Sequence, residues 1–179
     1  MDHGLIPRRY AKALYEVAVA KGSDEAIYGI MQRLTAAFAA EPKLGQTMAN
    51  PFVADKDKVR LIETAAAAGD NATFGDFMTL LHKNRRLDLV RGIADAYIDL
   101  YREKNHIFKV TVESAAPLTP AVQHRITELI QQHIGTGTLD CTFEVVPALI
   151  GGFRIRLGNE LLDATVATQL NNIRLELIK

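Results

Sequence analysis

The chain has 179 residues, of which 48% are hydrophobic and 23% charged, so it is long enough and apolar enough to bury one large core or two small ones. Its 21 basic and 21 acidic residues give a formal net charge of +0, which disfavours nucleic-acid binding because that normally needs a basic surface. The single cysteine, Cys141, excludes an intramolecular disulfide and a cysteine-rich zinc site, and no apolar run approaches the ~20 residues of a membrane-spanning helix.

The first 105 residues have a helical pattern that is rich in alanine and interrupted by capping residues. Pro7 favours the first turn of a helix and Gly22 favours its end, while Asn50 followed by Pro51 stops a helix. Six helices are predicted, from about Pro7 to Ala20, from a cap at Ser23 or Asp24 to about Phe38, from Pro42 to Asn50, from a cap at Asp55 to an end at Gly69, from a start at Asn71 or Thr73 to about Leu81, and from Leu87 to about Glu103. Their short polar connections favour antiparallel neighbours in a bundle.

Beyond residue 105 the pattern changes to β-branched alternation. Strands are predicted at Ile107–Val112 and Cys141–Val145, with a helix between them that begins near Thr119-Pro120. Cys141 alternates with the apolar residues of its strand, so we expect it to be a small buried hydrophobe.

The tail predicts a hairpin and a last helix. Phe153–Leu157 alternates as a strand, and Gly158-Asn159 accepts the positive φ of a tight turn, so the chain should fold back through Glu160 to Leu162. Asp163 is expected to cap a final helix whose apolar stripe is Val166, Leu170, Ile173 and Leu177.

The predicted fold class is therefore α+β. An amino-terminal six-helix bundle, residues 1–105, is followed by a small α+β domain, residues 106–179, in which two helices lie on one side of a short sheet. The polar run Glu103–His106 is the expected hinge between the two domains.

Patterns that carry chemistry are weak in this sequence. His124 and His133 lie nine residues apart, about half a turn out of phase on one helix, so they do not form a metal-binding pair. Gly151-Gly152 precedes a strand rather than a helix, which favours a bend or bulge over a phosphate-binding loop. No catalytic, cofactor-binding or metal-binding residue is predicted, and most carboxylates stand at helix starts, where capping explains them.

The first and fifth predicted helices carry more apolar surface than one core face requires. On the first, a stripe of Ile6, Tyr10, Ala13, Leu14 and Val17 is joined by further apolar residues around the helix. On the fifth, Leu80 lies about a hundred degrees from Leu81, which already belongs to a sufficient core face. Either the bundle encloses its first helix, or the two helices form a groove for an incoming amphipathic helix.

Five segments give the chain a family resemblance over nearly its whole length. They are RRYAKALYEVAVAKG near the amino terminus, NPFVADKDK at 50 to 58, FMTLLHKNRRLDLV at 77 to 90, VTVESAAPLT at 110 to 119 and ALIGGFRIRLGNELLDATV at 148 to 166. With these segments in this order, the chain resembles the delta subunit of bacterial F-type ATP synthases, the counterpart of the mitochondrial oligomycin-sensitivity-conferring protein. One departure is that Ala164 and Thr165 follow Asp163, where the family commonly has Asp-Gly-Ser.

The resemblance implies a non-catalytic stator subunit of the peripheral stalk, which serves ATP synthesis and hydrogen ion transport. It implies a peripheral location at the cytoplasmic face of the cell inner membrane, without membrane insertion, cofactor or nucleic acid. A single copy would belong to a hetero-oligomeric complex.

The resemblance also implies two partners. The first domain would bind the amino-terminal helix of an alpha subunit at the catalytic head, in a groove between the first and fifth helices, and the second domain would bind the b-subunit stalk. The family motifs assign Tyr10, Ala13 and Leu14 in YAKAL, and Leu80 and Leu81 in FMTLLHKN, as contact residues. The geometry of the same helix faces adds Ile6, Val17 and Phe77.

Two other kinds of function stay open at the level of the sequence. A small cytoplasmic enzyme or ligand-binding protein would use a cleft between the two domains, and turnover or nucleotide binding by the purified chain would favour it. An RNA-binding protein would use the sheet, with Arg154 and Arg156 on its outer face, and would bind RNA with a steep dependence on salt.

Overall fold

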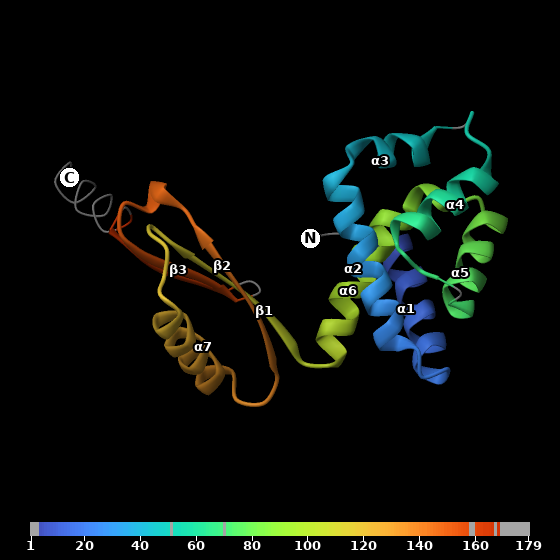
Figure 1. Ribbon diagram of the computed structural model, residues 1–179. Coiled ribbons are helices and arrows are strands. Elements are labelled where there is room, and N and C mark those ends of the chain that lie inside the picture. Colours follow the sequence, from blue (N-terminus) through green and yellow to red (C-terminus); the bar gives the residue numbers. More distant parts are fainter. Residues whose placement is uncertain (1–3, 51, 70, 158–159, 167, 169–179) are drawn as a thin grey trace. The chain divides into compact units, whose positions relative to one another are not determined.

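The computed structural model describes residues 4–50, 52–69, 71–157, 160–166 and 168. The chain divides into two compact units, Met1–Arg102 and Glu103–Lys179 (Figure 1). The fold is α+β, with the sheet confined to the second unit.

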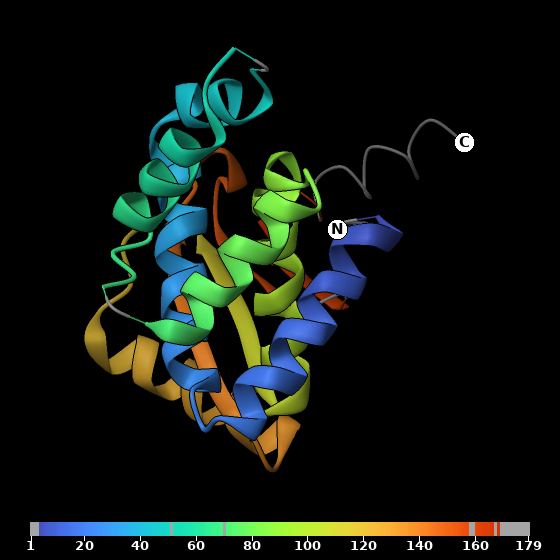
Figure 2. The ribbon, with the colours of Figure 1, turned by 90° about the vertical axis from the view of Figure 1, so that its right-hand side faces the viewer.

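Helices make up the described part of the first unit. Figure 2 shows them from a second side, with α1 in dark blue and α5 in green. They are α1 (Leu5–Ala20), α2 (Asp24–Ala40), α3 (Pro42–Ala49), α4 (Asp55–Ala65), α5 (Ala72–Lys83), the short 3-10 helix η1 (Leu87–Leu89) and α6 (Val90–Lys104).

The helix ends follow from local hydrogen bonds. Gly22 adopts φ 62°, and the N–H groups of Gly22 and Ser23 donate to the carbonyls of Val19 and Ala18, which closes α1 as a Schellman motif. At the start of α5, Asn71 rather than Thr73 is the capping residue, since its side chain accepts a hydrogen bond from the Phe74 N–H at 3.0 Å.

The start and the end predicted for α4 were both wrong. Asp55 is the first residue of α4 and not its cap, which is Ala54. The same helix ends at Ala65 and does not reach Gly69. The guanidinium of Arg33 in α2 donates to the carbonyl of Ala66 at 2.8 Å and thereby satisfies a group that a longer helix would have used.

Tyrosine rings pack in the core where α1, α2 and α6 meet. Tyr28 stacks on Tyr101 with ring centroids 4.2 Å apart, and the ring centroids of Tyr15 and Tyr97 lie 6.1 Å apart. The Tyr97 hydroxyl donates to the carbonyl of Asp24 at 3.2 Å. Burial raises the pKa of Tyr97 well above its usual range, and a nearby carboxylate, Asp24, adds to that shift.

The second unit contains a four-stranded sheet and one α-helix among its described elements. Figure 1 shows this helix beside the sheet. The elements are β1 (Ile107–Ser114), α7 (Pro120–Ile134), β2 (Thr138–Val145), the 3-10 helix η2 (Pro147–Leu149), β3 (Gly152–Leu157) and β4 (Glu160–Thr165). The strand order is β2-β1-β3-β4, with β1 parallel to β2 and antiparallel to β3. β3 and β4 pair as the predicted hairpin, although its turn, Gly158-Asn159, lies outside the described residues.

The two faces of the sheet differ in character. On one face Val110 and Val112 form a buried cluster with Ile130 of α7, and Cys141 packs against this cluster half-buried. On the other face the guanidinium of Arg154 pairs with the carboxylate of Glu113. The charge of Arg154 is therefore partly neutralised by Glu113, which makes the alternative hypothesis of RNA binding by this face less favourable.

The start of β3 needs its glycine. Gly152 has φ 78°, and a Cβ there would overlap the carbonyl oxygen of Ala164 on the neighbouring strand. This is the bend at a strand start that the sequence predicted, and Ala164 lies within β4.

The role predicted for Asp163 was wrong in one respect. Asp163 lies in β4, where its carboxylate accepts hydrogen bonds from the Thr165 N–H at 3.0 Å and the Thr165 hydroxyl at 2.7 Å. The hydroxyl oxygen of Thr165 in turn accepts from the Thr168 N–H at 3.3 Å, so Thr165 has the capping position. These bonds from Thr165 hold the pKa of the Asp163 carboxyl below its usual range. The rest of the predicted last helix, with Leu170, Ile173 and Leu177, lies outside the described residues.

Candidate partner-binding groove

Helices α1 and α5 are antiparallel neighbours that are joined near both ends. At the end of α1, the Lys21 Nζ lies 3.2 Å from the Asp76 Oδ2, close to the start of α5. Near the start of α1, the Asn84 side-chain amide donates to the Tyr10 hydroxyl at 3.2 Å, just after the end of α5. The two helices therefore run side by side in opposite directions.

One face of α1 packs into the core, and the adjoining face of the helix stays exposed. The buried residues of α1 are Pro7, Ala11, Leu14 and Ala18, which recur at the spacing of a single helical stripe. The exposed apolar residues that flank this stripe on the α5 side are Ile6, Ala13 and Val17. The bundle thus does not enclose its first helix.

Two adjoining hollows lie between α1 and α5. One, of about 390 Å³, is lined by Ile6, Arg9, Tyr10, Ala13, Leu80 and Arg86. The other, of about 150 Å³, is lined by Tyr10, Ala13, Leu14, Val17, Thr73, Asp76, Phe77 and Leu80. Because Tyr10, Ala13 and Leu80 line both hollows, we treat them as one surface and call it the α1/α5 groove.

Seven of the eight contact residues expected from the sequence line this groove. Its walls are Ile6, Val17 and Leu80, which are 43%, 46% and 44% exposed, and its floor includes Leu14 and Phe77, at 3% and 5%. Tyr10 and Ala13 lie between them, in both hollows.

Leu81 is the exception. It is 0% exposed and lines neither hollow, because its position on α5 points into the core while Leu80 points outward. A side chain with no accessible surface cannot touch a partner, so Leu81 belongs to the packing of the unit and not to the groove.

The sequence did not single out the polar residues at the two ends of the groove. Arg9 and Arg86 lie at the end near Ile6, and Asp76 and Thr73 lie at the end near Val17. The sequence could have predicted the position of Asp76, since Asp76 precedes Leu80 by four residues and so lies on the same face of the helix. Arg86 follows the helix in the chain, so only the folded structure brings it to the groove.

The groove is apolar along its length and polar at its ends, which suits a docked side-chain stripe rather than a chemical reaction. In the described part of the chain, no cluster of three or more His, Cys, Asp or Glu side chains is placed to hold a metal ion. Nor does any helix in that part combine the length and apolarity needed to cross a membrane.

Comparisons with known proteins agree over nearly the whole chain. The family model described as ATP synthase delta (OSCP) subunit matches residues 6–177. An ATP synthase subunit delta from Parabacteroides distasonis is 36% identical over 179 residues, covering 100% of this chain and 99% of that protein. A second, from Bacteroides thetaiotaomicron, is 33% identical and covers 99% of this chain and 96% of the relative.

The fold also recurs in a solved structure. A chain in a cryo-EM structure of the Toxoplasma gondii mitochondrial ATP synthase hexamer matches with a TM-score of 0.75 at 22% identity. The match covers 98% of this chain and 99% of that chain.

Proposed function

The chain belongs to the ATP synthase delta (OSCP) subunit family, and on that premise we propose that it is a non-catalytic stator subunit of a proton-translocating F-type ATP synthase. In this role it joins the catalytic head to the peripheral stalk. The central shaft of such an enzyme can drive ATP synthesis only if the head is kept from turning with it. The subunit therefore transmits a holding force and performs no chemistry.

The α1/α5 groove is the observation that carries the proposal for the first domain. Its exposed walls and buried floor form an apolar channel beside a helix with a small residue, Ala13, at its centre. Such a channel accepts the apolar stripe of an amphipathic helix. The occupant we propose is the amino-terminal helix of an alpha subunit of the head.

The chemistry of the groove suits a contact that must persist under load. Affinity in related complexes is tuned mostly through the dissociation rate, and a few well-packed aromatic or large apolar residues carry most of the energy. Tyr10 and Leu80 are such residues here, since both line both hollows. Arg9, Arg86 and Asp76 at the rim contribute mainly to orientation and to the association rate.

The remaining parts of the proposal follow from the family. The first domain is a six-helix bundle, residues 1–105, that binds the head, and the second, residues 106–179, binds the b-subunit stalk. The subunit is present as a monomer in the hetero-oligomeric complex and lies peripherally at the cytoplasmic face of the cell inner membrane.

Titration of the full-length chain with the purified catalytic head tests the proposal. We expect the wild-type chain to bind and Tyr10→Asp to weaken binding by several kcal/mol, because docking would bury a carboxylate in a largely apolar channel in place of an aromatic ring. Val19→Asp is the matched control: Val19 is 49% exposed on the side of α1 opposite Tyr10, so it adds the same charge away from the groove.

Three outcomes are informative. If the folded Tyr10→Asp protein binds the head as tightly as the wild type, the groove is not the docking site. If both substitutions weaken binding equally, the effect is one of charge and the groove is again excluded. If the wild-type chain does not bind the head at all, the stator role itself fails.

A further inference from the structure

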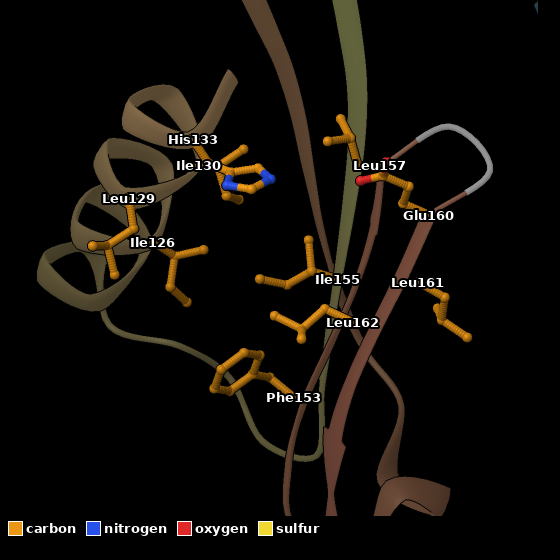
Figure 3. Close-up of a pocket in the computed structure, with 10 residues that line it drawn as sticks. All are labelled: Ile126, Leu129, Ile130, His133, Phe153, Ile155, Leu157, Glu160, Leu161 and Leu162. Carbon is orange, nitrogen blue, oxygen red and sulfur yellow. The ribbon is translucent and has the colours of Figure 1, made fainter. Parts of the chain in front are cut away.

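An apolar hollow of about 460 Å³ lies in the second unit between α7 and the hairpin of β3 and β4 (Figure 3). The side chains of Ile126, Ile155 and Leu162 point toward one another across it. Because apolar residues make up most of its lining, this hollow carries no pattern of charges that would identify an occupant. The α1/α5 groove does carry such a pattern, at one of its ends.

The turn that follows α5 forms that end of the groove. Arg85 adopts φ 55°, in the left-handed region that glycine favours. Its N–H donates to the carbonyl of His82 at 3.0 Å, and the N–H of Arg86 donates to the carbonyl of Leu81 at 2.9 Å. These two hydrogen bonds close α5 as a Schellman motif and fix the backbone on either side of Arg85.

The fixed turn brings two polar side chains to the groove. The side-chain amide of Asn84 donates to the Tyr10 hydroxyl at 3.2 Å, and Arg86 lines the hollow of about 390 Å³. Arg9, on α1, lines the same hollow from the opposite helix. An arginine therefore lies on each side of the groove at this end, and we call Arg9 and Arg86 the arginine pair.

The arginine pair has no counter-charge in the described part of the chain. None of the other residues that line its hollow is acidic, and among the described residues no ion pair or hydrogen bond involves either guanidinium group. At the other end of the groove Asp76 is already matched, since the Lys21 Nζ lies 3.2 Å from its Oδ2. The groove is thus positive at the end near Ile6 and close to neutral at the end near Val17.

We propose that the arginine pair binds a carboxylate, carried by an Asp or Glu side chain of the helix that docks in the α1/α5 groove. This inference rests on the proposed docking of that helix and adds the chemistry that the helix must carry. Arginine suits the task because its planar fork of N–H donors matches the two oxygens of a carboxylate. Arginines on both sides of the groove can hold one carboxylate between them.

The bound carboxylate sets the position of the docked helix along the groove. Apolar contacts alone do not distinguish sharply between positions that differ by one helical turn, about 5.4 Å. A helix shifted by one turn would move its carboxylate away from the arginine pair and leave both guanidinium groups unmatched beside apolar side chains. The arginine pair therefore favours one position of the helix and disfavours the others.

A double-mutant cycle with the full-length chain and a synthetic peptide of the alpha subunit's amino-terminal helix tests the proposal. The chain carries Arg86→Gln, and each acidic residue of the peptide is replaced in turn by its amide. At about 50 mM salt we expect Arg86→Gln to weaken binding of the native peptide about tenfold. One of the peptide substitutions should cause a similar loss, and combining it with Arg86→Gln should cause little further loss.

Arg85→Gln is the matched control. It removes the same charge from the neighbouring residue of the same turn, and Arg85 lines neither hollow. We expect it to weaken binding about twofold or less, through the long-range field alone. Arg9→Gln should show the same dependence on the same acidic residue of the peptide as Arg86→Gln does.

The possible outcomes separate this inference from the docking on which it rests. If the wild-type chain does not bind the peptide, the docking fails and the inference fails with it. If the wild type binds but Arg85→Gln costs as much as Arg86→Gln, docking stands and the arginine pair is not a binding site. If Arg86→Gln weakens binding but depends on no acidic residue of the peptide, the pair contacts backbone carbonyls of the helix, and the proposal is overturned.

Charge reversal gives a second, independent measurement. Arg86→Glu should bind the native peptide more weakly than Arg86→Gln does, because it places like charges together. A peptide in which the coupled acidic residue is replaced by lysine should bind Arg86→Glu at least ten times more tightly than the native peptide does. Absence of this recovery in the folded variant would contradict direct contact between the two residues.

Discussion

Leu80→Asp is the substitution that best separates an effect on binding at the α1/α5 groove from an effect on the stability of the core. Leu80 lines both hollows of the α1/α5 groove and is 44% exposed in the free chain, so it contributes little to the core. A docked helix would cover its remaining surface. The substitution therefore adds a charge where a partner would lie and removes almost nothing from the interior.

The expected magnitude follows from this exposure. Complete burial of a leucine side chain is worth about 1.5–3 kcal/mol, and the 44% still exposed corresponds to about 1 kcal/mol of lost apolar contact. Burying an unpaired carboxylate against an apolar helix adds a further cost of about 2 kcal/mol or more. Together these predict a loss of about 3 kcal/mol, or roughly a hundredfold in the dissociation constant.

The assay is isothermal titration of the full-length chain with a synthetic peptide of the alpha subunit's amino-terminal helix. Thr79→Asp is the control, since Thr79 is exposed on the same helix, adjacent to Leu80, and lines neither hollow. The unfolding free energies of the two variants should differ by less than about 1 kcal/mol, the scale of surface charge pairs on a helix. Equal peptide affinities for these two folded variants would refute the assignment of Leu80 to the docking surface.

Three further predictions concern stability. Gly152→Ala should destabilise the second unit by more than about 2 kcal/mol in urea unfolding, because the residue has φ 78° and its Cβ would overlap β4; an unchanged midpoint would contradict this. Gly45→Ala should instead raise stability by about 0.5–1 kcal/mol, since Gly45 lies within α3 and a Cβ there meets nothing within 4 Å. Burial raises the pKa of Tyr97 above its unfolded value, so the stability it contributes is complete below about pH 10 and falls as the pH rises further, when only the unfolded chain loses the proton. Thermal unfolding between pH 8 and pH 11.5 should show that fall, and Tyr97→Phe should reduce its slope.

Much of the helical part follows from short-range signals that the sequence contains. Gly22 ends α1 and Pro42 begins α3, because positive φ and a fixed φ are local properties of these residues. The end of α4 was not predictable in this way. Ala67 adopts φ 44°, which is uncommon for a residue other than glycine, and the N–H groups of Ala67 and Ala68 donate to the carbonyls of Thr64 and Glu63 to close the helix. Arg33, far away in the sequence, satisfies the carbonyl of Ala66 only in the folded unit.

The sheet shows the same limit. The strand predicted at Cys141–Val145 begins three residues earlier, at Thr138, because Thr138 pairs with Ile107 of β1. Thr138 is a polar residue after a glycine-rich stretch, so its local sequence does not indicate a strand. It becomes part of β2 only because it pairs with the neighbouring strand β1. Likewise, the periodicity of α5 showed that Leu80 and Leu81 differ in direction, but only the packed unit shows that Leu81 is the one the core covers.

The docking that we propose at the α1/α5 groove requires a groove that has its shape before the partner arrives, since reorganisation on docking would reduce the affinity. The exposed ion pair between Lys21 and Asp76 adds little to this rigidity. The packing of α1 adds more. Pro7 is buried against α6, where Gly92 leaves room for it: a Cβ at Gly92 would lie only 3.4 Å from the Pro7 ring. The buried stripe from Pro7 to Ala18 thus fixes the orientation of α1, and the same orientation turns Ile6, Ala13 and Val17 toward the groove. The core face of α1 therefore determines the geometry of the face that we propose for docking.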